Sequence, residues 1–244
     1  MTLLIVGGGR MGEALVAGLL AADREAGSLA IAEVAAARRE QLESAYPGVS
    51  VVAAPTAAAS AVLAVKPGDV GAAAGVTTRA IEEASGGRLR VVRAMPNTPA
   101  LVGAGAAAIC AGSTAELHDL DWAESILGAV GVVVRVAEKD LDAVTGLSGS
   151  GPAYVFVVAE AMAEAGVLAG LSRDVAERLA FQTLLGSARL LVEDGGSPAA
   201  LRAAVTSPGG TTAAGLRELE RHGVRGAFLE AVMAAAARSR ELGA

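Results

Sequence analysis

The chain has 244 residues, of which 53% are hydrophobic but only 2% aromatic, and it carries a net charge of −6 at pH 7. This length allows a substantial core, and the acidic balance without a basic cluster argues against binding to nucleic acids and to anionic membranes. Cys110 is the only cysteine, so no intrachain disulfide can form, and we expect a buried thiol in a protein of the reducing cytoplasm.

Short strand-like runs and helical runs alternate through the first half of the chain. This alternation predicts an α/β fold, with a parallel sheet covered on both faces by helices. The strands expected in chain order are 2–7, 28–33, 49–53 and 60–65, with further strands at 89–93, 106–111 and 132–136. The helices expected among the first strands are 11–22 and 36–46.

A glycine-rich turn follows the first expected strand. Gly7, Gly9 and Gly12 match the pattern G-x-G-x-x-G between a strand and a helix, which is typical of dinucleotide-binding domains. The first glycine forms the turn, the second lets a pyrophosphate approach the backbone, and the third allows the helix to pack on the strand. Arg10 and Met11 occupy the variable positions of this predicted cofactor site.

An acidic residue, Glu33, ends the second expected strand about 20 residues after the last glycine of the turn. Its carboxylate is placed to accept hydrogen bonds from the adenosine ribose hydroxyls, and it would repel the 2′-phosphate of NADPH. Arg38 and Arg39 follow closely and could bind that phosphate instead. We therefore expect NADH or NADPH as the cofactor, with a modest preference for NADH.

From about residue 140 the pattern changes to long segments rich in Ala, Leu, Glu and Arg. It predicts a dinucleotide-binding domain, 1–139, followed by an all-helical domain, 140–244. The first two helical segments are apolar nearly all round and must be buried. The second domain cannot bury them alone, so we expect a homodimer or an assembly of dimers. The expected helices are 152–169, 173–194, 198–204, 212–222 and 225–242.

Small hydroxyl residues and glycines precede one of these helices. The segment 205–212 reads Val-Thr-Ser-Pro-Gly-Gly-Thr-Thr and leads into a helix-like run that ends at Arg221. A helix N-terminus offers unpaired N–H groups and a partial positive charge, so it can capture an anion such as a carboxylate. The alternative interpretation is an N-capped helix after a turn, without a ligand.

Three separated motifs give the chain its most specific resemblance. They are residues 93–99, residues 147–154 and the segment 205–212. In this order they resemble pyrroline-5-carboxylate reductase, the enzyme that makes proline, over nearly the whole chain. The resemblance implies a Rossmann-like domain, followed by a helical domain that dimerises and binds the substrate.

The resemblance also implies roles for individual residues. Thr212 corresponds to a catalytic hydroxyl that hydrogen-bonds to the substrate nitrogen. Ser207 and Gly209, with the N–H groups of Gly210 and Thr211, correspond to the turn that binds the substrate carboxylate. The residues that would line the nicotinamide and its ribose are Val65, Lys66, Pro67, Met95, Pro96 and Asn97.

One segment departs from the family pattern. The family places a helix and a strand between its Val-Lys-Pro motif and a later Ala-Gly-[Ile/Val]-Thr segment. Here only residues 68–73 separate Pro67 from the matching segment 74–77, which is too short for both elements. We therefore expect a shortened first domain.

The reaction implied is hydride transfer from NADH or NADPH to the imine carbon of 1-pyrroline-5-carboxylate, which gives L-proline. The alternatives are another two-domain NAD(P)-dependent imine or hydroxyacid reductase, or a catalytically silent nucleotide-binding protein. His118 and His222 are expected to be solvated rather than catalytic. Asp119, Asp121 and Asp140 lack the spacing of metal ligands, so no metal is expected.

Overall fold

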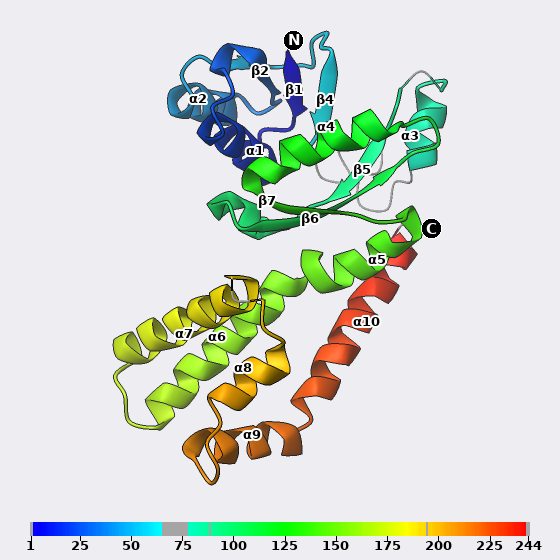
Figure 1. The fold of residues 1–244 in the computed structure, drawn as a ribbon. Coiled ribbons are helices and arrows are strands. Elements are labelled where there is room, and N and C mark those ends of the chain that lie inside the picture. Colours follow the sequence, from blue (N-terminus) through cyan, green and yellow to red (C-terminus); the bar gives the residue numbers. More distant parts are fainter. Residues whose placement is uncertain (1, 65–77, 88, 194, 243–244) are drawn as a thin grey trace. The chain divides into compact units, whose positions relative to one another are not determined.

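A computed structural model of the chain describes residues 2–64, 78–87, 89–193 and 195–242. The chain forms two compact units (Figure 1). The first unit comprises Met1–Ser150 together with Met233–Ala244, and the second comprises Gly151–Val232. The predicted site residues Val65, Lys66 and Pro67, and the shortened segment after them, lie outside the described residues.

A parallel sheet opens the first unit. Its strands are β1 (Leu3–Val6), β2 (Leu29–Ala32), β3 (Ser50–Val52) and β4 (Ser60–Leu63), in the order β3-β2-β1-β4. All three pairings are parallel, with Leu3 opposite Leu29 and Ser60. The helices α1 (Arg10–Ala21) and α2 (Ala36–Ala45) connect the first strands, and the side chains of β1 and β2 are almost wholly buried. The predicted Rossmann-like parallel sheet is therefore confirmed.

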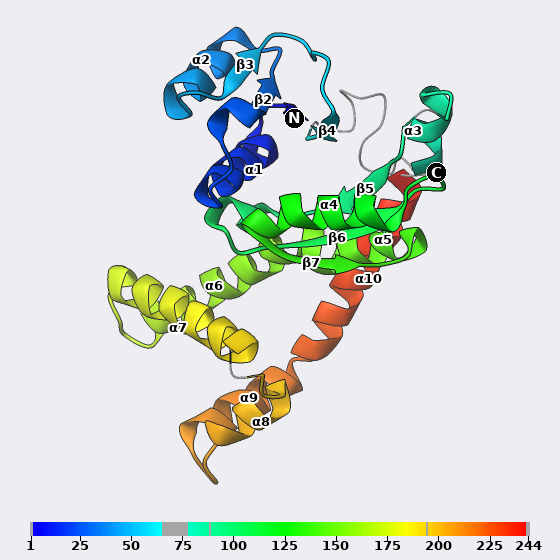
Figure 2. The ribbon, with the colours of Figure 1, turned by 45° about the horizontal axis from the view of Figure 1, so that its top comes forward.

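The later strands of this unit form a second sheet rather than extending the first. They are β5 (Val92–Met95), β6 (Gly105–Ala111) and β7 (Gly131–Arg135), and β5 runs antiparallel to β6. The helix α4 (Leu117–Leu127), which the sequence pattern did not predict, lies along this sheet (Figure 2). Leu15 of α1, Ile109 of β6 and Ile126 of α4 belong to one hydrophobic core, so both sheets share it.

The strand predicted at 89–93 begins later, at Val92. Leu89 and Arg90 instead belong to the connection after α3 (Thr78–Ala84), where the Leu89 N–H donates to Ser85 Oγ at 3.4 Å. Short connecting elements complete the unit. They are the 3₁₀ turns Ala26–Ser28, Thr98–Val102, Gly128–Val130 and Glu138–Asp140, the short helix α5 (Leu141–Val144) and a π turn, Thr145–Gly149.

The second unit is helical, as predicted. It contains α6 (Gly151–Leu168), α7 (Arg173–Glu193), α8 (Pro198–Ala204), α9 (Thr211–Arg221) and the first half of α10 (Val224–Leu242). The buried hydrophobic residues among its described positions are all alanines: Ala159, Ala163, Ala176 and Ala180. They form a close seam between α6 and α7, because residues four apart share one helix face.

The large apolar side chains of this unit face outward. Phe156 is 63% exposed and Leu229 is 68% exposed. One helical stretch among the described residues, Glu138–Leu168, is long and apolar enough to cross a membrane by length and composition alone, and only 6% of its most apolar window is buried. A single helix of this kind is weak evidence for a membrane span, since a helix covered by another subunit has the same composition.

Candidate functional site

The glycine turn between β1 and α1 has the backbone that its sequence predicts. Gly7 has φ +105°, a left-handed value that favours glycine, and its N–H donates to the Ala32 carbonyl at 2.8 Å. A Cβ at Gly12 would lie 2.0 Å from the Gly7 carbonyl oxygen, so helix and turn can approach only because residue 12 is glycine. Gly9 caps α1 without a side-chain hydrogen bond, and the space where its Cβ would be is open. This open helix N-terminus fits a pyrophosphate.

Glu33 reaches back from the end of β2 to this turn. Its two carboxylate oxygens accept from the N–H groups of Gly8 and Ala35, each at 2.9 Å. The carboxylate is therefore fixed beside the glycine turn, where a bound ribose can meet it. The structure thus brings Glu33 and the glycine turn together, although they are far apart in the sequence.

Arg10 and Met11, the variable residues of the glycine turn, differ in burial. Arg10 is exposed at the start of α1 and makes no hydrogen bond or ion pair within the described part of the chain. Met11 is half-buried and packs against the core. Of the two, Arg10 has the free charge that a phosphate would require.

Met95, Pro96 and Asn97 follow one another where β5 ends. Asn97 Oδ1 accepts from the Ala106 N–H at 2.8 Å, while Asn97 Nδ2 donates to the carbonyl oxygen and to Oγ of Ser148, each at 3.2 Å. A Cβ at Gly149 would lie 2.4 Å from Met95 Cε, so this glycine makes room for the methionine. These contacts hold the end of β5 against the π turn before α6, a type of distortion that often occurs at functional sites.

The turn 207–210 forms the second candidate region, in the helical unit. The Gly210 N–H donates to the Ser207 carbonyl at 3.0 Å, and Gly209 has φ +68°. A Cβ at Gly210 would lie 2.4 Å from Ser207 Oγ, so the serine hydroxyl packs over this glycine. These residues lead directly into α9, whose first residues are Thr211 and Thr212.

The N-terminus of α9 is open to a ligand. Gly210 caps the helix without a side-chain hydrogen bond, and both threonines are exposed. The Thr212 hydroxyl makes no hydrogen bond among the residues that the structure describes, so nothing there indicates that it serves as a helix cap. Free N–H groups, two hydroxyls and the helix dipole together suit a carboxylate.

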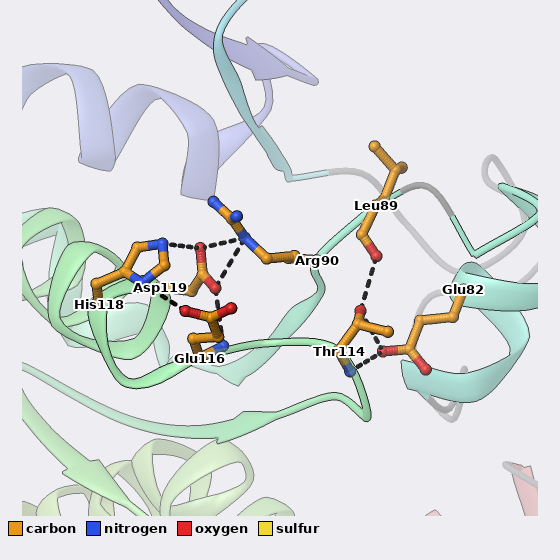
Figure 3. Close-up of polar contacts among 7 residues, drawn as sticks. All are labelled: Glu82, Leu89, Arg90, Thr114, Glu116, His118 and Asp119. Carbon is orange, nitrogen blue, oxygen red and sulfur yellow. Dashed lines mark hydrogen bonds and ion pairs between the residues drawn. The ribbon is translucent and has the colours of Figure 1, made fainter.

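Several charged residues outside the glycine turn and the turn 207–210 form a polar cluster at the start of α4 (Figure 3). Arg90 Nε donates to the Asp119 carboxylate at 3.0 Å, and Asp119 also accepts from the Glu116 N–H at 2.8 Å. The latter bond, followed by the ion pair with Arg90, lowers the pKa of Asp119 despite some desolvation. His118 is 58% exposed beside Glu116 and Asp119. Within the described ranges, no group of three or more His, Cys, Asp or Glu could hold a metal ion.

Two contributions to the predicted cofactor site were not expected from the sequence. Ser148 and Gly149 support Asn97 and Met95, and Glu13 forms an ion pair with Arg38 beside the glycine turn. The motif at 147–154 carried a signal for the first pair, because glycine and serine side by side in a helical segment indicate a tight approach. No local signal pointed to Glu13, whose partner lies on another helix.

A glycine turn with an acidic residue at the ribose position, joined to a helical unit, defines a two-domain dinucleotide-dependent oxidoreductase. Residues 138–242 match the family model described as pyrroline-5-carboxylate reductase dimerisation. Residues 2–85 match the model described as NADP oxidoreductase, coenzyme F420-dependent. The chain belongs to the pyrroline-5-carboxylate reductase family.

Full-length relatives agree with this assignment. The chain is 41% identical to the pyrroline-5-carboxylate reductase of Corynebacterium melassecola, over 99% of this chain and 98% of the relative. It is 45% identical to the pyrroline-5-carboxylate reductase of Synechocystis, over 98% of this chain and 97% of the relative. A solved pyrroline-5-carboxylate reductase from Coxiella burnetii is 36% identical, with a TM-score of 0.91 over 100% of this chain and 98% of that one. The solved pyrroline carboxylate reductase from Plasmodium falciparum, with NADP bound, is 28% identical. Its TM-score is 0.83 over 100% of this chain and 98% of that one.

The relatives also bear on the length of the chain. The alignment with the Corynebacterium protein spans 266 positions, whereas this chain has 244 residues. The relative therefore has residues without a counterpart in this chain.

Proposed function

We propose that the protein catalyses the reduction of 1-pyrroline-5-carboxylate to L-proline with NADH or NADPH as the hydride donor. The observation that carries this proposal is the open N-terminus of α9 in a chain that also has the dinucleotide turn. At this helix end lie Ser207 and the Thr212 hydroxyl, which has no hydrogen bond to any residue that the structure describes. The relatives that match over nearly the whole chain are named for this reaction.

The cofactor, when bound, supplies the hydride, and the protein binds and orients it. The backbone of Gly7, Gly9 and Gly12 would hold the pyrophosphate at the start of α1, with Arg10 and Met11 beside it. Glu33 would accept hydrogen bonds from the adenosine ribose. The nicotinamide and its ribose would lie against Met95, Pro96 and Asn97, together with Val65, Lys66 and Pro67.

The substrate is small and carries one carboxylate and one ring nitrogen. Ser207 and Gly209, with the N–H groups of Gly210 and Thr211, would bind the carboxylate. The Thr212 hydroxyl would hydrogen-bond to the nitrogen, whose protonation changes as hydride reaches the neighbouring carbon. Holding the two reacting carbons close and aligned can lower the activation free energy by several kcal/mol, up to about 7–11.

The finer cofactor choice rests on Glu33. Its carboxylate is fixed beside the turn and carries a negative charge, so it disfavours the 2′-phosphate of NADPH. We therefore propose a modest preference for NADH.

The working form is proposed to be a homodimer or an assembly of dimers in the cytoplasm, without nucleic-acid or membrane partners. The outward-facing apolar residues of the helical unit and the match of residues 138–242 to a dimerisation family support a second copy as their cover. In functional terms we divide the chain into a dinucleotide-binding part, 1–139, and a helical part for substrate binding and dimerisation, 140–244.

The decisive experiment follows the absorbance of NADH and of NADPH with 1-pyrroline-5-carboxylate as substrate. We expect oxidation of both, with substrate-dependent formation of proline. Dinucleotide binding without turnover would favour the catalytically silent alternative. Turnover of another imine or of a hydroxyacid, but not of this substrate, would favour a different two-domain reductase.

A further inference from the structure

Gly8, the middle residue of the three-glycine run, is held from both sides by side chains of the β2–α2 region. Its N–H donates to Glu33 Oε2 at 2.9 Å, and its carbonyl oxygen accepts from Arg38 Nε at 2.8 Å. Both peptide groups around Gly8 are therefore fixed. Because Gly8 directly precedes the N-cap Gly9, these bonds also set the direction of the N–H groups that open α1.

Arg38 is itself held in place by further contacts. Its Nη2 forms an ion pair with Glu13 of α1, and its Nη1 donates to Gln41 Oε1 at 3.1 Å. Glu13 also accepts from the Tyr46 hydroxyl at 3.3 Å. All three nitrogens of the guanidinium thus have protein partners, and a phosphate could recruit Arg38 only by breaking some of these contacts.

We infer that Arg38 is a positioning residue of the dinucleotide turn and does not read the 2′-phosphate. The inference rests on the proposed function, and it deepens it by separating the roles of Glu33 and Arg38. Glu33 lies beside the turn, where the adenosine ribose would bind, so it sets the choice between NADH and NADPH. Arg38 acts through the Gly8 carbonyl, so it affects the binding of both dinucleotides alike.

Two substitutions separate a positioning role from phosphate recognition. Arg38→Ala removes the contacts with Gly8, Gln41 and Glu13. Arg38→Lys keeps the charge, but its single side-chain nitrogen cannot make all three contacts of the planar guanidinium. We expect each to weaken NADH and NADPH about tenfold in titrations of binding, with their ratio changing less than about twofold. If Arg38 bound the 2′-phosphate, Arg38→Lys would retain NADPH affinity, since lysine also binds phosphate. Selective loss of NADPH in Arg38→Ala, or its recovery in Arg38→Lys, would overturn the inference.

A second measurement needs no dinucleotide. Amide hydrogen exchange over residues 7–12 should be faster in Arg38→Ala than in the wild type, and Glu13→Gln should show a smaller change in the same direction. Arg79→Ala is the matched control, because Arg79 is an exposed arginine of the same unit that pairs only with Glu83 among its described contacts. Unchanged exchange in Arg38→Ala would refute the inference. A wild-type protein that binds neither dinucleotide would instead refute the proposed function, and the exchange data would still decide whether Arg38 holds Gly8.

Discussion

The side-chain amide of Asn97 joins the end of β5 to Ser148 in the π turn, although the two residues lie 51 positions apart in the sequence. Nδ2 donates to both the carbonyl oxygen and Oγ of Ser148 at 3.2 Å, and Oδ1 accepts from the Ala106 N–H at 2.8 Å. One asparagine thus connects three segments of the first unit. It thereby fixes Met95 and Pro96, which we propose to line the nicotinamide.

Asn97→Asp tests this connection. The aspartate keeps the acceptor for Ala106 but loses both donors and places a carboxylate against two oxygens of Ser148. We expect a loss of about 1–3 kcal/mol, seen as a lower melting temperature, together with weaker dinucleotide binding. Ser148→Ala is the matched control, because it leaves the carbonyl contact intact and removes the hydroxyl, which accepts from Asn97 and donates to the Ala106 carbonyl at 3.5 Å. It should cost about 0.5–1.5 kcal/mol. An effect of Asn97→Asp no larger than that of Ser148→Ala would contradict the role given to the carbonyl contact.

Glu82 gives a prediction about pH. Glu82 is only 6% exposed, and its carboxylate accepts from Ser113 Oγ at 2.7 Å. It also accepts from Thr114, whose hydroxyl donates to the Leu89 carbonyl as well (Figure 3). The hydrogen bond from Ser113 lowers the pKa of Glu82, against the effect of desolvation. The ionised form is therefore favoured in the folded state, and its contribution to stability is lost as the pH falls through that lowered pKa.

Glu82→Gln should consequently destabilise the protein most near neutral pH. The difference in melting temperature from the wild type should stay constant from about pH 7 down to the ordinary pKa of a glutamate, about 4.3, and should shrink as the pH falls below that value. Glu83→Gln serves as the control, because Glu83 is 65% exposed and pairs with Arg79 on the surface. A difference between Glu82→Gln and the wild type that does not vary with pH would contradict this account.

The sequence predicted those features that depend on local pattern. The apolar runs of β1 and β2 indicated buried parallel strands, and the spacing of Gly7, Gly9 and Gly12 indicated the turn. The helices of the second unit begin and end within a residue or two of the expected positions, because Gly170 and the turn 208–210 interrupt the pattern. Local sequence was sufficient for these elements.

Features that depend on distant contacts were not predictable. The pairing of β5 antiparallel to β6 follows from long-range packing, and the strand was expected three residues too early. The contact of Asn97 with Ser148 and that of Arg38 with Gly8 join segments that no periodicity connects. A polar residue in a turn indicates only that a partner exists, since buried polar groups are hydrogen-bonded, and not which partner it is.

Cofactor choice should change when Glu33 is replaced. Glu33→Ser removes the charge that repels the 2′-phosphate and one acceptor for the ribose hydroxyls. We expect the NADH/NADPH ratio of kcat/KM to fall by about tenfold, on the order of 1.4 kcal/mol. The same ratio in Arg79→Ala should match the wild type. An unchanged ratio in Glu33→Ser would show that Glu33 does not read the ribose.

The assembly can be tested on the apolar face of α6. Phe156 and Val157 are 63% and 62% exposed in the single chain, and Phe156→Glu would place a charge where we expect a second copy. Light scattering at micromolar concentration should show a dimer or a larger assembly for the wild type and a loss of assembly for Phe156→Glu. Arg79→Glu, on the surface of the first unit, should leave the assembly intact. A stable and active wild-type monomer would contradict the proposal, and a protein that needs detergent would point to a membrane instead.

Thr212 is expected to make the most specific contact with the reacting nitrogen. As hydride reaches the imine carbon, the nitrogen changes its bonding and protonation, so a fixed hydroxyl can act as a donor. Losing one such hydrogen bond costs about 1–3 kcal/mol, which corresponds to roughly one to two decades in rate. Thr212→Ala should therefore lower kcat, with little effect on dinucleotide affinity.

Ser207→Ala provides the contrast, because its hydroxyl would contact the carboxylate both before and during the reaction. Its loss should raise KM for 1-pyrroline-5-carboxylate more than it lowers kcat. The competing view is that Thr212 only caps α9, in which case Thr212→Ala would lower the melting temperature and spare the kinetics. The Thr212 hydroxyl bonds to no backbone group of α9 in the described chain, which favours the catalytic role. Full activity of Thr212→Ala with a depressed melting temperature would assign this hydroxyl to the helix rather than to the substrate.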